Sequence, residues 1–312
     1  MNATTSIRRA IPADAEVSLW HAPDGWALRR FDWPGGERGS ILFQCGRADV
    51  FEKYLETFGF WHAEGWSVTS LDWRGQGGSG RLSADARVGH VDTFGSWVSD
   101  LGAFWCDWAA AHRGPHVAMG HSMGGHLLLQ AMLETAIEPD AAVLIAPMTG
   151  LRGPIGARWA EHVVRFMRNR GDPARAAWKA GARPGPKHER QTILTSDRSR
   201  YEDEQWWYEQ DPDIKLGPPS WSWLTEAYAS TRVQRGDPRL ATLAVPILML
   251  VADADELVDA EASVEVAQRL PDAELLRFGR ESAHEILRES DEVRDRALGA
   301  IRTFLDARAP QR

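Results

Sequence analysis

The sequence predicts an α/β fold in which a mostly parallel sheet is flanked by helices on both faces. Short runs rich in β-branched and apolar residues alternate with segments in which apolar residues recur at helical spacing, and this alternation is typical of a parallel sheet covered on both sides. The alternation stops near residue 148, where Pro, Gly, Arg and Trp become dense, and resumes near residue 236. We therefore expect an α/β core formed by residues 1–147 and 236–312 and a segment inserted at residues 148–235.

The expected elements of the core follow from the spacing of apolar residues. Buried parallel strands are nearly continuous apolar runs, and such runs lie at residues 26–32, 39–44, 66–71, 115–120, 141–146, 245–251 and 273–278. A helix needs an apolar stripe, and in one segment this stripe contains Phe94, Trp97, Leu101 and Phe104. The expected helices lie at residues 50–63, 94–111, 123–135, 259–269 and 290–307.

The composition favours a soluble, cytoplasmic protein that does not bind nucleic acid. The formal net charge is -8, which disfavours a polyanionic partner. The two cysteines, Cys45 and Cys106, cannot build a disulfide framework, so a reducing compartment is expected. The N-terminal residues contain no continuous apolar signal segment, and no stretch approaches the ~20 apolar residues that span a membrane.

A glycine-rich stretch, DWRGQGGSGR at residues 72–81, contains the spacing G-x-G-x-x-G at Gly75, Gly77 and Gly80. A dinucleotide-binding loop must open directly into a helix whose N-terminus holds the phosphates. The residues that follow carry no helical stripe, and the next expected helix begins only at Phe94. The stretch is therefore interpreted as a tight loop in which glycines supply positive φ, and no nucleotide cofactor is expected.

The motif G-x-S-x-G occurs at residues 120–124, with Ser122 at its centre. It lies between an apolar run that predicts a strand and a segment, LLLQAML, that predicts a helix. A serine on such a sharp strand-to-helix turn is presented as a nucleophile, and the turn needs small flanking residues because it crowds the backbone. Ser122 is therefore the candidate nucleophile, and the backbone N–H of Met123 is a candidate oxyanion donor. His121 and His126 are expected to be packed side chains, and no metal site is expected.

A serine nucleophile needs a base, and the base needs an acid that holds its tautomer. After a G-x-S-x-G serine, the acid and then the histidine follow along the chain. His284 is the only histidine beyond the expected strand at 245–251, and it lies in the loop before the last helix. The acid should come directly after that strand. The candidates within VADADELVD are Asp253, Asp255, Glu256 and Asp259. The order of the residues does not choose among them.

Together these motifs resemble the serine hydrolases of the α/β-hydrolase fold that are related to monoacylglycerol lipase and the bacterial lysophospholipases. The resemblance extends over about residues 26–305 and comprises D-x-R-G-x-G-x-S from Asp72, the G-x-S-x-G turn, VADADELVD and AHEILRE. It implies an α/β-hydrolase fold in which the inserted residues 148–235 form a helical cap. It also places the catalytic acid at Asp255, with Asp253 as the alternative.

The resemblance further indicates the second oxyanion donor. In relatives the loop after the strand at 39–44 commonly carries His-Gly, and this chain has Gln44-Cys45-Gly46-Arg47 there. Aligning Gly46 with the family glycine makes the backbone N–H of Arg47 the second donor. Cys45 then occupies the usual histidine position, and it is expected to be a packed apolar residue rather than a nucleophile.

The resemblance implies a cofactor-independent serine carboxylic ester hydrolase that acts through an acyl-enzyme on monoacyl lipids. Lysophospholipids are favoured as substrates, and monoacylglycerols are the alternative. A small-ester or amide hydrolase is a second alternative, since this superfamily also includes peptidases. A catalytically silent α/β-hydrolase that serves as a binding protein is a third, which the complete set of Ser122, Asp255 and His284 disfavours.

The inserted segment is basic, unlike the rest of the chain. Residues 152–190 contain ten Lys or Arg and three Asp or Glu, a net charge of +7. Within them, ARWAEHVVRFMRNR predicts an amphipathic helix with an apolar stripe and flanking arginines. The stripe is Trp159, Val163, Phe166 and Met167, and the arginines are Arg158, Arg165, Arg168 and Arg170.

Two interpretations of this helix remain open. It either buries its stripe on the core, or forms a lid over Ser122 whose basic rim contacts an anionic membrane surface, such as the inner membrane face. Arginine also suits recognition of a phosphate, which favours lysophospholipid over monoacylglycerol as the substrate.

Overall fold

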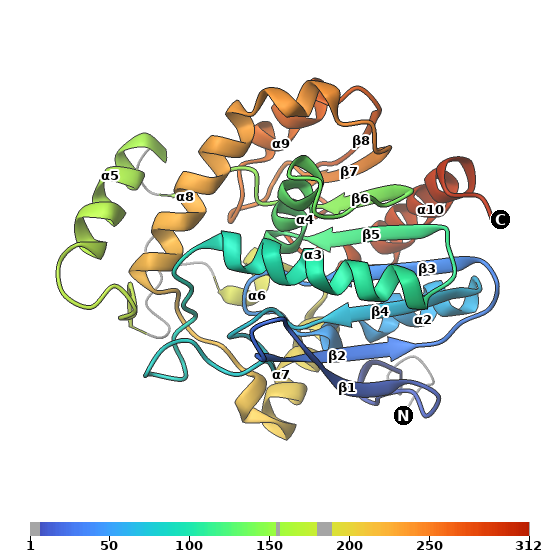
Figure 1. Ribbon diagram of the computed structural model, residues 1–312, viewed down its shortest axis with the longest axis horizontal. Coiled ribbons are helices and arrows are strands. Elements are labelled where there is room, and N and C mark those ends of the chain that lie inside the picture. The colour runs from blue at the N-terminus through green and yellow to red at the C-terminus, as the bar shows by residue number, and fades with distance from the viewer. Residues whose placement is uncertain (1–6, 154–156, 180–188, 312) are drawn as a thin grey trace.

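A mixed sheet forms the centre of the protein, as the computed structural model in Figure 1 shows. The structure describes residues 7–153, 157–179 and 189–311. The strands are β1 (Glu16–His21), β2 (Ala27–Trp33), β3 (Gly39–Gln44), β4 (Trp66–Leu71), β5 (His116–His121), β6 (Ala141–Ile145), β7 (Ile247–Ala252) and β8 (Ala273–Phe278). Their order in the sheet is β1-β2-β4-β3-β5-β6-β7-β8. The strands from β4 to β8 in this order are parallel, whereas β2 pairs antiparallel with both of its neighbours.

Helices cover both faces of the sheet. One face packs against α3 (Phe94–Ala111), α4 (Met123–Leu133) and α9 (Ala260–Arg269). The other packs against the 3-10 helix η1 (Phe51–Tyr54), α2 (Leu55–Ala63) and α10 (Asp291–Arg308). Successive side chains of a strand point to opposite faces, so in β3 Leu42 joins the first apolar cluster and Ile41 and Phe43 join the second. The predicted arrangement, a mostly parallel sheet flanked by helices, is confirmed.

The predicted core elements occur within two residues of their expected ends, but the sequence did not predict β1. This strand pairs antiparallel with β2 at the edge of the sheet, from Glu16 opposite Asp32 to His21 opposite Ala27. Its apolar residues Val17 and Leu19 are 43% and 57% exposed. An edge strand with solvent-facing apolar side chains lacks the buried apolar run by which the other strands were recognised.

The glycine-rich stretch after β4 is a tight loop, as predicted. Gly75, Gly77 and Gly80 have φ values of +80°, +50° and +74°, a region that non-glycine residues rarely adopt. The loop folds around the buried Asp72, whose carboxylate accepts hydrogen bonds from the backbone N–H of Gly78 (2.9 Å) and from Arg29 Nε (2.7 Å). A Cβ on Gly77 would lie 2.1 Å from Asp72 Oδ2. The glycines are therefore required by the backbone and by the room that Asp72 needs.

Helices are inserted between β6 and β7. They are α5 (Ala157–Arg168), α6 (Arg190–Leu194), α7 (Arg198–Gln210), the 3-10 helix η2 (Pro212–Ile214), α8 (Trp221–Gly236) and the 3-10 helix η3 (Pro238–Thr242). The helix α5 packs against α8 and forms one end of the molecule (Figure 1). None of the described helices is long and apolar enough to cross a lipid bilayer.

The amphipathic helix predicted in the basic segment exists as α5, and its buried residues are not those of the predicted stripe. Ala160 and Val164 are buried. Trp159, Val163 and Phe166 are 75%, 46% and 55% exposed. The interpretation in which the whole predicted stripe is buried on the core is therefore wrong for these three residues, because neighbouring positions of the helix make the contact with α8 instead.

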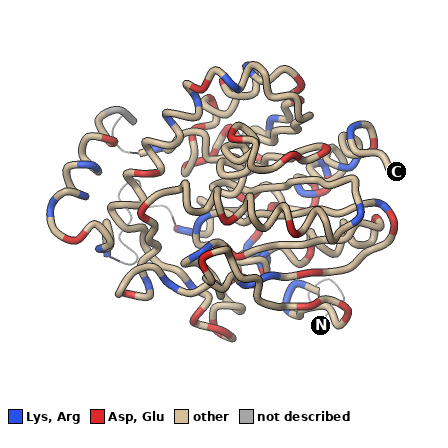
Figure 2. Tube along the Cα trace, viewed as in Figure 1, with Lys and Arg blue, Asp and Glu red and all other residues tan. Residues whose placement is uncertain are grey.

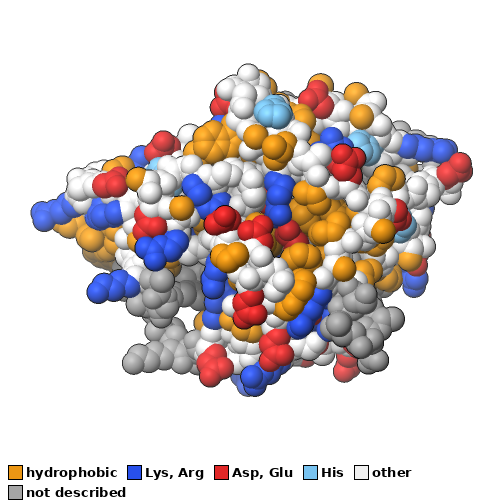
Figure 3. Space-filling model, turned by 90° about the horizontal axis from the view of Figure 1, so that it is seen from below, with side chains coloured by type: hydrophobic (Ala, Val, Ile, Leu, Met, Phe, Trp, Pro, Cys, Tyr) orange, Lys and Arg blue, Asp and Glu red, His pale blue; other side chains and the backbone are white. Residues whose placement is uncertain are grey.

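Basic side chains accompany this exposed apolar surface. Arg165 and Arg170 are exposed and Arg168 is half-buried, whereas the side chain of Arg158 lies outside the described residues. Figure 2 shows the basic positions along α5, and Figure 3 shows basic and hydrophobic side chains together at this end of the molecule. We name Trp159, Val163 and Phe166 the exposed stripe.

Candidate active site

Ser122 lies on a sharp turn between β5 and α4. Its backbone has φ 53° and ψ -117°, a conformation that a non-glycine residue adopts only when its surroundings hold it there. Three backbone hydrogen bonds do so: Ser122 N–H donates to Ile145 O (2.9 Å), and Ser122 O accepts from His126 N–H (3.1 Å) and Met148 N–H (3.0 Å). The turn is thus fixed from β6 and from α4, and the serine side chain remains half-buried.

The two glycines of the motif are required by close backbone contacts. A Cβ on Gly120 would lie 2.7 Å from the carbonyl carbon of Gly124. A Cβ on Gly124 would lie 2.3 Å from Gln44 O and 2.6 Å from Cys45 O. Only a residue without a side chain lets the first turn of α4 approach the loop after β3 this closely. The motif therefore brings the serine and this loop together.

The loop after β3 passes beside Ser122. A Cβ on Gly46 would lie 3.2 Å from Ser122 Cβ. The backbone N–H of Arg47, the next residue, donates no hydrogen bond to any described residue. Met123 is the first residue of α4, so its N–H has no carbonyl partner within the helix. Both predicted oxyanion donors are therefore without a backbone hydrogen-bond partner among the described residues.

Cys45 is packed away from the serine. Its side chain is 1% exposed, belongs to the apolar cluster under α2 and α10, and lies 3.8 Å from Ser70 Oγ on β4. Burial, with the nearby Asp49 carboxylate, raises the pKa of the Cys45 thiol well above its usual value. A buried thiol of raised pKa is an inert packing group rather than a nucleophile.

His284 and Asp255 are brought together from different loops. His284 Nδ1 donates to Asp255 Oδ2 at 2.5 Å, and both side chains are buried. The other oxygen of Asp255 accepts from the N–H groups of Leu257 (2.7 Å) and Val258 (3.0 Å). Burial alone would lower the pKa of His284, but the charge and hydrogen bond of Asp255 raise it above its usual value. In the neutral imidazole this arrangement leaves Nε2 as the proton acceptor.

Two of the other acidic candidates, Asp253 and Asp259, make contacts away from His284. Asp253 forms an ion pair with Arg277 at 2.8 Å, and the two side chains are 39% and 40% exposed. Asp259 caps α9 by accepting from the N–H of Glu261. Of the two aspartates between which the resemblance chose, only Asp255 contacts His284.

The histidine ring is held beside the serine turn. The rings of His284 and His121 lie 4.7 Å apart, and His121 directly precedes Ser122. Within the described part of the chain, Ser122 Oγ makes no hydrogen bond to His284. Hydrogen bonds of this kind commonly tighten only when substrate is bound.

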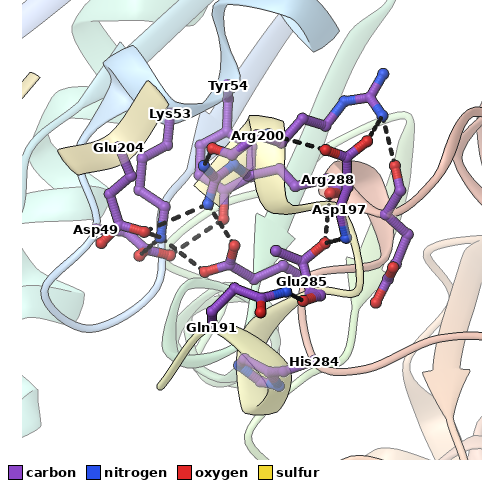
Figure 4. Close-up of polar contacts among 12 residues, drawn as sticks. Asp49, Lys53, Tyr54, Gln191, Asp197, Arg200, Glu204, His284, Glu285 and Arg288 are labelled. Atoms are coloured by element: carbon purple, nitrogen blue, oxygen red, sulfur yellow. Dashed lines mark hydrogen bonds and ion pairs between the residues drawn. The ribbon is translucent and has the colours of Figure 1, made fainter. Parts of the chain in front are cut away.

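A group of buried charges next to His284 was not predicted from the sequence (Figure 4). Lys53 Nζ, whose side chain has no exposed surface, contacts Asp49, Glu285 (2.7 Å) and Glu204 (3.4 Å). Arg288 pairs with Glu285 and lies 3.5 Å from Glu204. We name these five residues the buried charge cluster. Burial would lower the pKa of Lys53, but the three carboxylates raise it above its usual value, so the lysine stays charged.

The buried charge cluster connects the inserted helices to the histidine loop. Glu204 belongs to α7, whereas Glu285 directly follows His284. Backbone contacts join the same segments: Glu285 N–H donates to Leu194 O (2.7 Å), and Thr195 Oγ1 donates to the carbonyl of Arg288 (2.7 Å). The end of α6 therefore runs beside the loop that carries His284 and restrains it.

Among the described residues, no group of three His, Cys, Asp or Glu side chains is arranged to hold a metal ion. His126, which the sequence placed among the packed histidines, is fully buried and lies 2.7 Å from Ser230 Oγ on α8. Burial lowers its pKa to about 4, so it is neutral at physiological pH.

The buried charge cluster makes a prediction about stability. Lys53→Met should lower the free energy of unfolding by about 3–5 kcal/mol, because it leaves three buried carboxylates without their shared cation. Urea unfolding followed by tryptophan fluorescence measures this change. Lys179→Met, at an exposed lysine, is the control and should stay within about 0.5 kcal/mol of the wild type. Equal stabilities of the two variants would contradict a structural role for the cluster.

Comparison with known proteins identifies the family. Residues 35–291 match the family described as "Serine aminopeptidase, S33". The chain is 34% identical to lysophospholipase L2 of Escherichia coli (strain K12) over 284 residues, which cover 85% of this chain and 80% of that protein. It is 27% identical to the probable lysophospholipase L2 of Haemophilus influenzae over 277 residues, with 87% and 85% covered.

Solved structures show the same fold. A soluble variant of monoglyceride lipase from Saccharomyces cerevisiae superimposes with a TM-score of 0.74, covering 96% of this chain and 98% of that one at 16% identity. The monoacylglycerol lipase of Paleococcus ferrophilus superimposes with a TM-score of 0.71, covering 89% and 98% at 17% identity. The chain therefore has the α/β-hydrolase fold and belongs to the serine aminopeptidase S33 family, among esterase- and lipase-type hydrolases similar to lysophospholipase L2.

Proposed function

We propose that the protein is a serine carboxylic ester hydrolase that cleaves lysophospholipids through an acyl-enzyme. The observation that carries this proposal is the 2.5 Å hydrogen bond between His284 Nδ1 and Asp255, on loops next to the strained turn of Ser122. A nucleophile on such a turn, a histidine and a buried acid are the groups that acyl transfer needs. Similarity to lysophospholipase L2 supports the lipid substrate.

The residues have distinct roles in the proposed reaction. Ser122 Oγ attacks the ester carbonyl carbon while His284 Nε2 takes the hydroxyl proton, and Asp255 orients the imidazole and stabilises its cation. The backbone N–H groups of Met123 and Arg47 stabilise the oxyanion of the tetrahedral intermediate. The intermediate collapses to the acyl-enzyme, and His284 returns the proton to the departing glycerol oxygen.

A water molecule completes the cycle. It attacks the carbonyl carbon of the acyl-enzyme while His284 accepts one of its protons. The bond to Ser122 Oγ then breaks, the serine regains its proton from His284, and the fatty acid leaves. No cofactor is needed in this scheme, because every proton is carried by the imidazole.

Monoacylglycerol hydrolysis is the alternative within the same chemistry, and the fold shared with monoglyceride lipases is its support. Small-ester or amide hydrolysis is a further alternative. Its support is that the matched family is described as serine aminopeptidases. A catalytically silent binding protein is disfavoured by the contact between His284 and Asp255. A substrate panel separates these functions.

We further propose that residues 148–235 form a cap over Ser122 and that α5 lets it contact an anionic membrane surface. The exposed stripe presents a tryptophan, a valine and a phenylalanine to solvent, with Arg165 exposed on the same helix and Arg170 exposed just after its end. Aromatic and apolar side chains insert at the lipid headgroup boundary, and each nearby basic residue adds about 1 kcal/mol on an anionic surface. This arrangement suits an enzyme whose substrate resides in the membrane.

The first test of the proposed function is the substrate panel. Wild-type protein should hydrolyse lysophosphatidylcholine and lysophosphatidylethanolamine faster than monoacylglycerol or short p-nitrophenyl esters. Ser122→Ala and His284→Ala should each lower turnover by roughly four orders of magnitude or more, because these residues act as a unit. A fluorophosphonate should label the wild type and not Ser122→Ala. Turnover by a folded Ser122→Ala variant near the wild-type rate would refute the mechanism.

The pH dependence tests the acid. His284 must be neutral to accept a proton, and its pKa is raised above 6.5 by Asp255, so the acid limb of kcat/KM should have its midpoint above pH 6.5. Asp255→Asn should reduce activity by roughly 10⁴-fold and move this midpoint to lower pH, because burial without the carboxylate favours the neutral ring. Asp253→Asn is the matched control. If the Asp253 variant is instead the inactive one, the catalytic acid is Asp253 and its assignment to Asp255 is wrong.

Membrane contact is tested by sedimentation with vesicles of rising phosphatidylglycerol content. Binding should increase with anionic lipid and weaken at high salt, because screening shortens the range of the arginine charges. Arg165→Glu with Phe166→Ser should reduce binding at least about tenfold. Arg198→Glu, at an exposed arginine of α7, should bind as the wild type does. Absence of binding to every vesicle composition would rule out this role of α5.

A further inference from the structure

Three buried side-chain donors without a hydrogen-bond partner gather around Arg47. They are Nε of Arg47, Nε1 of Trp223 and Nε2 of Gln76, and none of them has a partner among the described residues. Trp223 and Gln76 are 6% and 2% exposed. Buried donors are nearly always paired in folded proteins, so three unpaired donors in one place require an explanation.

Contacts join these donors into one site. The guanidinium carbon of Arg47 lies 5.2 Å from the centroid of the Trp223 ring, at the start of α8. Gln76 Oε1 accepts from the backbone N–H of Ala48 (2.7 Å), which brings its Nε2 to the same loop. Arg47 Nη2 donates to Gly217 O (2.6 Å), and a Cβ on Gly89 would lie 2.7 Å from this nitrogen. The arginine side chain therefore lies between the core and the inserted helices.

Arg47 gives the site a positive charge. Arg47 forms no ion pair with a described carboxylate, unlike the half-buried Arg29 and the buried Arg200 and Arg288. The neighbouring Asp49 is already engaged by Lys53 and by the hydroxyl of Tyr54. Burial, followed by the charge of Arg190, lowers the pKa of Arg47 to about 10, so the guanidinium stays cationic at neutral pH. Unpaired donors and an unpaired cation suit an anion that accepts several hydrogen bonds.

We propose that Arg47, Gln76 and Trp223 form a binding site for the phosphodiester of a lysophospholipid. This inference rests on the proposed function, because the main-chain N–H of Arg47 would hold the oxyanion of the same substrate. The glycerol link between the acyl carbonyl and the phosphate is similar in length to an arginine side chain. One residue thus contacts the reacting carbonyl with its backbone and the phosphate with its guanidinium.

The site gives a physical basis for substrate choice. A phosphodiester supplies acceptors for the unpaired donors and a charge for the arginine, whereas the free hydroxyl of a monoacylglycerol leaves the cation unneutralised. A site built to pair with a substrate group rejects an analogue that lacks it. The preference for lysophospholipid over monoacylglycerol should therefore depend on these three side chains.

The experiment compares kcat/KM for decanoyl lysophosphatidylcholine and monodecanoylglycerol, both below the concentration at which they form micelles. Arg47→Met keeps an unbranched stem without the guanidinium and should lower the ratio of the two values by about 100-fold. Trp223→Phe keeps an aromatic ring without the N–H and should lower it by about fivefold. Arg87→Met, at an exposed arginine that pairs with Asp85, should leave the ratio unchanged. Both substrates present the same ester to the same oxyanion donors, so a main-chain disturbance lowers both values alike. Equal losses on the two substrates would overturn the proposal.

Binding to Ser122→Ala separates this site from the proposed function. Calorimetry with glycerophosphocholine and with inorganic phosphate should show tighter binding of the phosphodiester, and Arg47→Met in the same background should abolish it. Tighter binding of inorganic phosphate would overturn the assignment to a headgroup. If the wild type hydrolyses only monoacylglycerol, the proposed substrate is wrong, whereas phosphodiester binding that depends on Arg47 still supports the site. Absence of binding by both anions would overturn it.

Discussion

The candidate site depends on one close backbone contact, between the first turn of α4 and the loop after β3. Gly124 approaches the carbonyl oxygens of Gln44 and Cys45 so closely that no side chain fits at this position. The contact requires the tight turn on which Ser122 sits, with its positive φ, and it places Gly46 and Arg47 beside the serine. Parallel strands that end at the same edge of the sheet bring the remaining loops to this point.

The buried charge cluster is costly to desolvate, and it positions the inserted helices against the histidine loop. Removing five charged side chains from water is expensive, and the ion pairs return the cost only if every charge finds a partner. Lys53 and Arg288 are shared among three carboxylates that come from the loop after β3, from α7 and from the residue after His284. Because these partners lie on different segments, the pairing fixes how the inserted helices sit against the histidine loop. The same cluster therefore links the stability of the inserted segment to the position of the proposed base.

The sequence predicted the features that depend on local pattern and missed those that depend on distant contacts. Strands and helices of the core follow from apolar spacing, and Ser122 and His284 follow from a motif and from order along the chain. The choice of Asp255 needed a family resemblance, since four acidic residues follow β7 at similar spacing. Glu204 pairs with Lys53 across almost half of the chain, and no local pattern marks either residue. The sequence left the buried face of α5 open between two interpretations, because apolar spacing defines a stripe but does not determine which part of it meets α8.

The backbone and the side chain of Arg47 meet different structural requirements. Its backbone N–H needs only the geometry of the loop, so the departure at Cys45 leaves this group in place beside Ser122. Its side chain, in contrast, is a half-buried cation whose buried Nε has no partner among the described residues, an arrangement that costs about 1–3 kcal/mol for each unpaired group. Folding alone does not favour such a cost, because an apolar side chain at this position would avoid it. A ligand that carries a negative charge would pair with these groups and offset their cost on binding. The protein would then bind that ligand more tightly than an analogue without the charge.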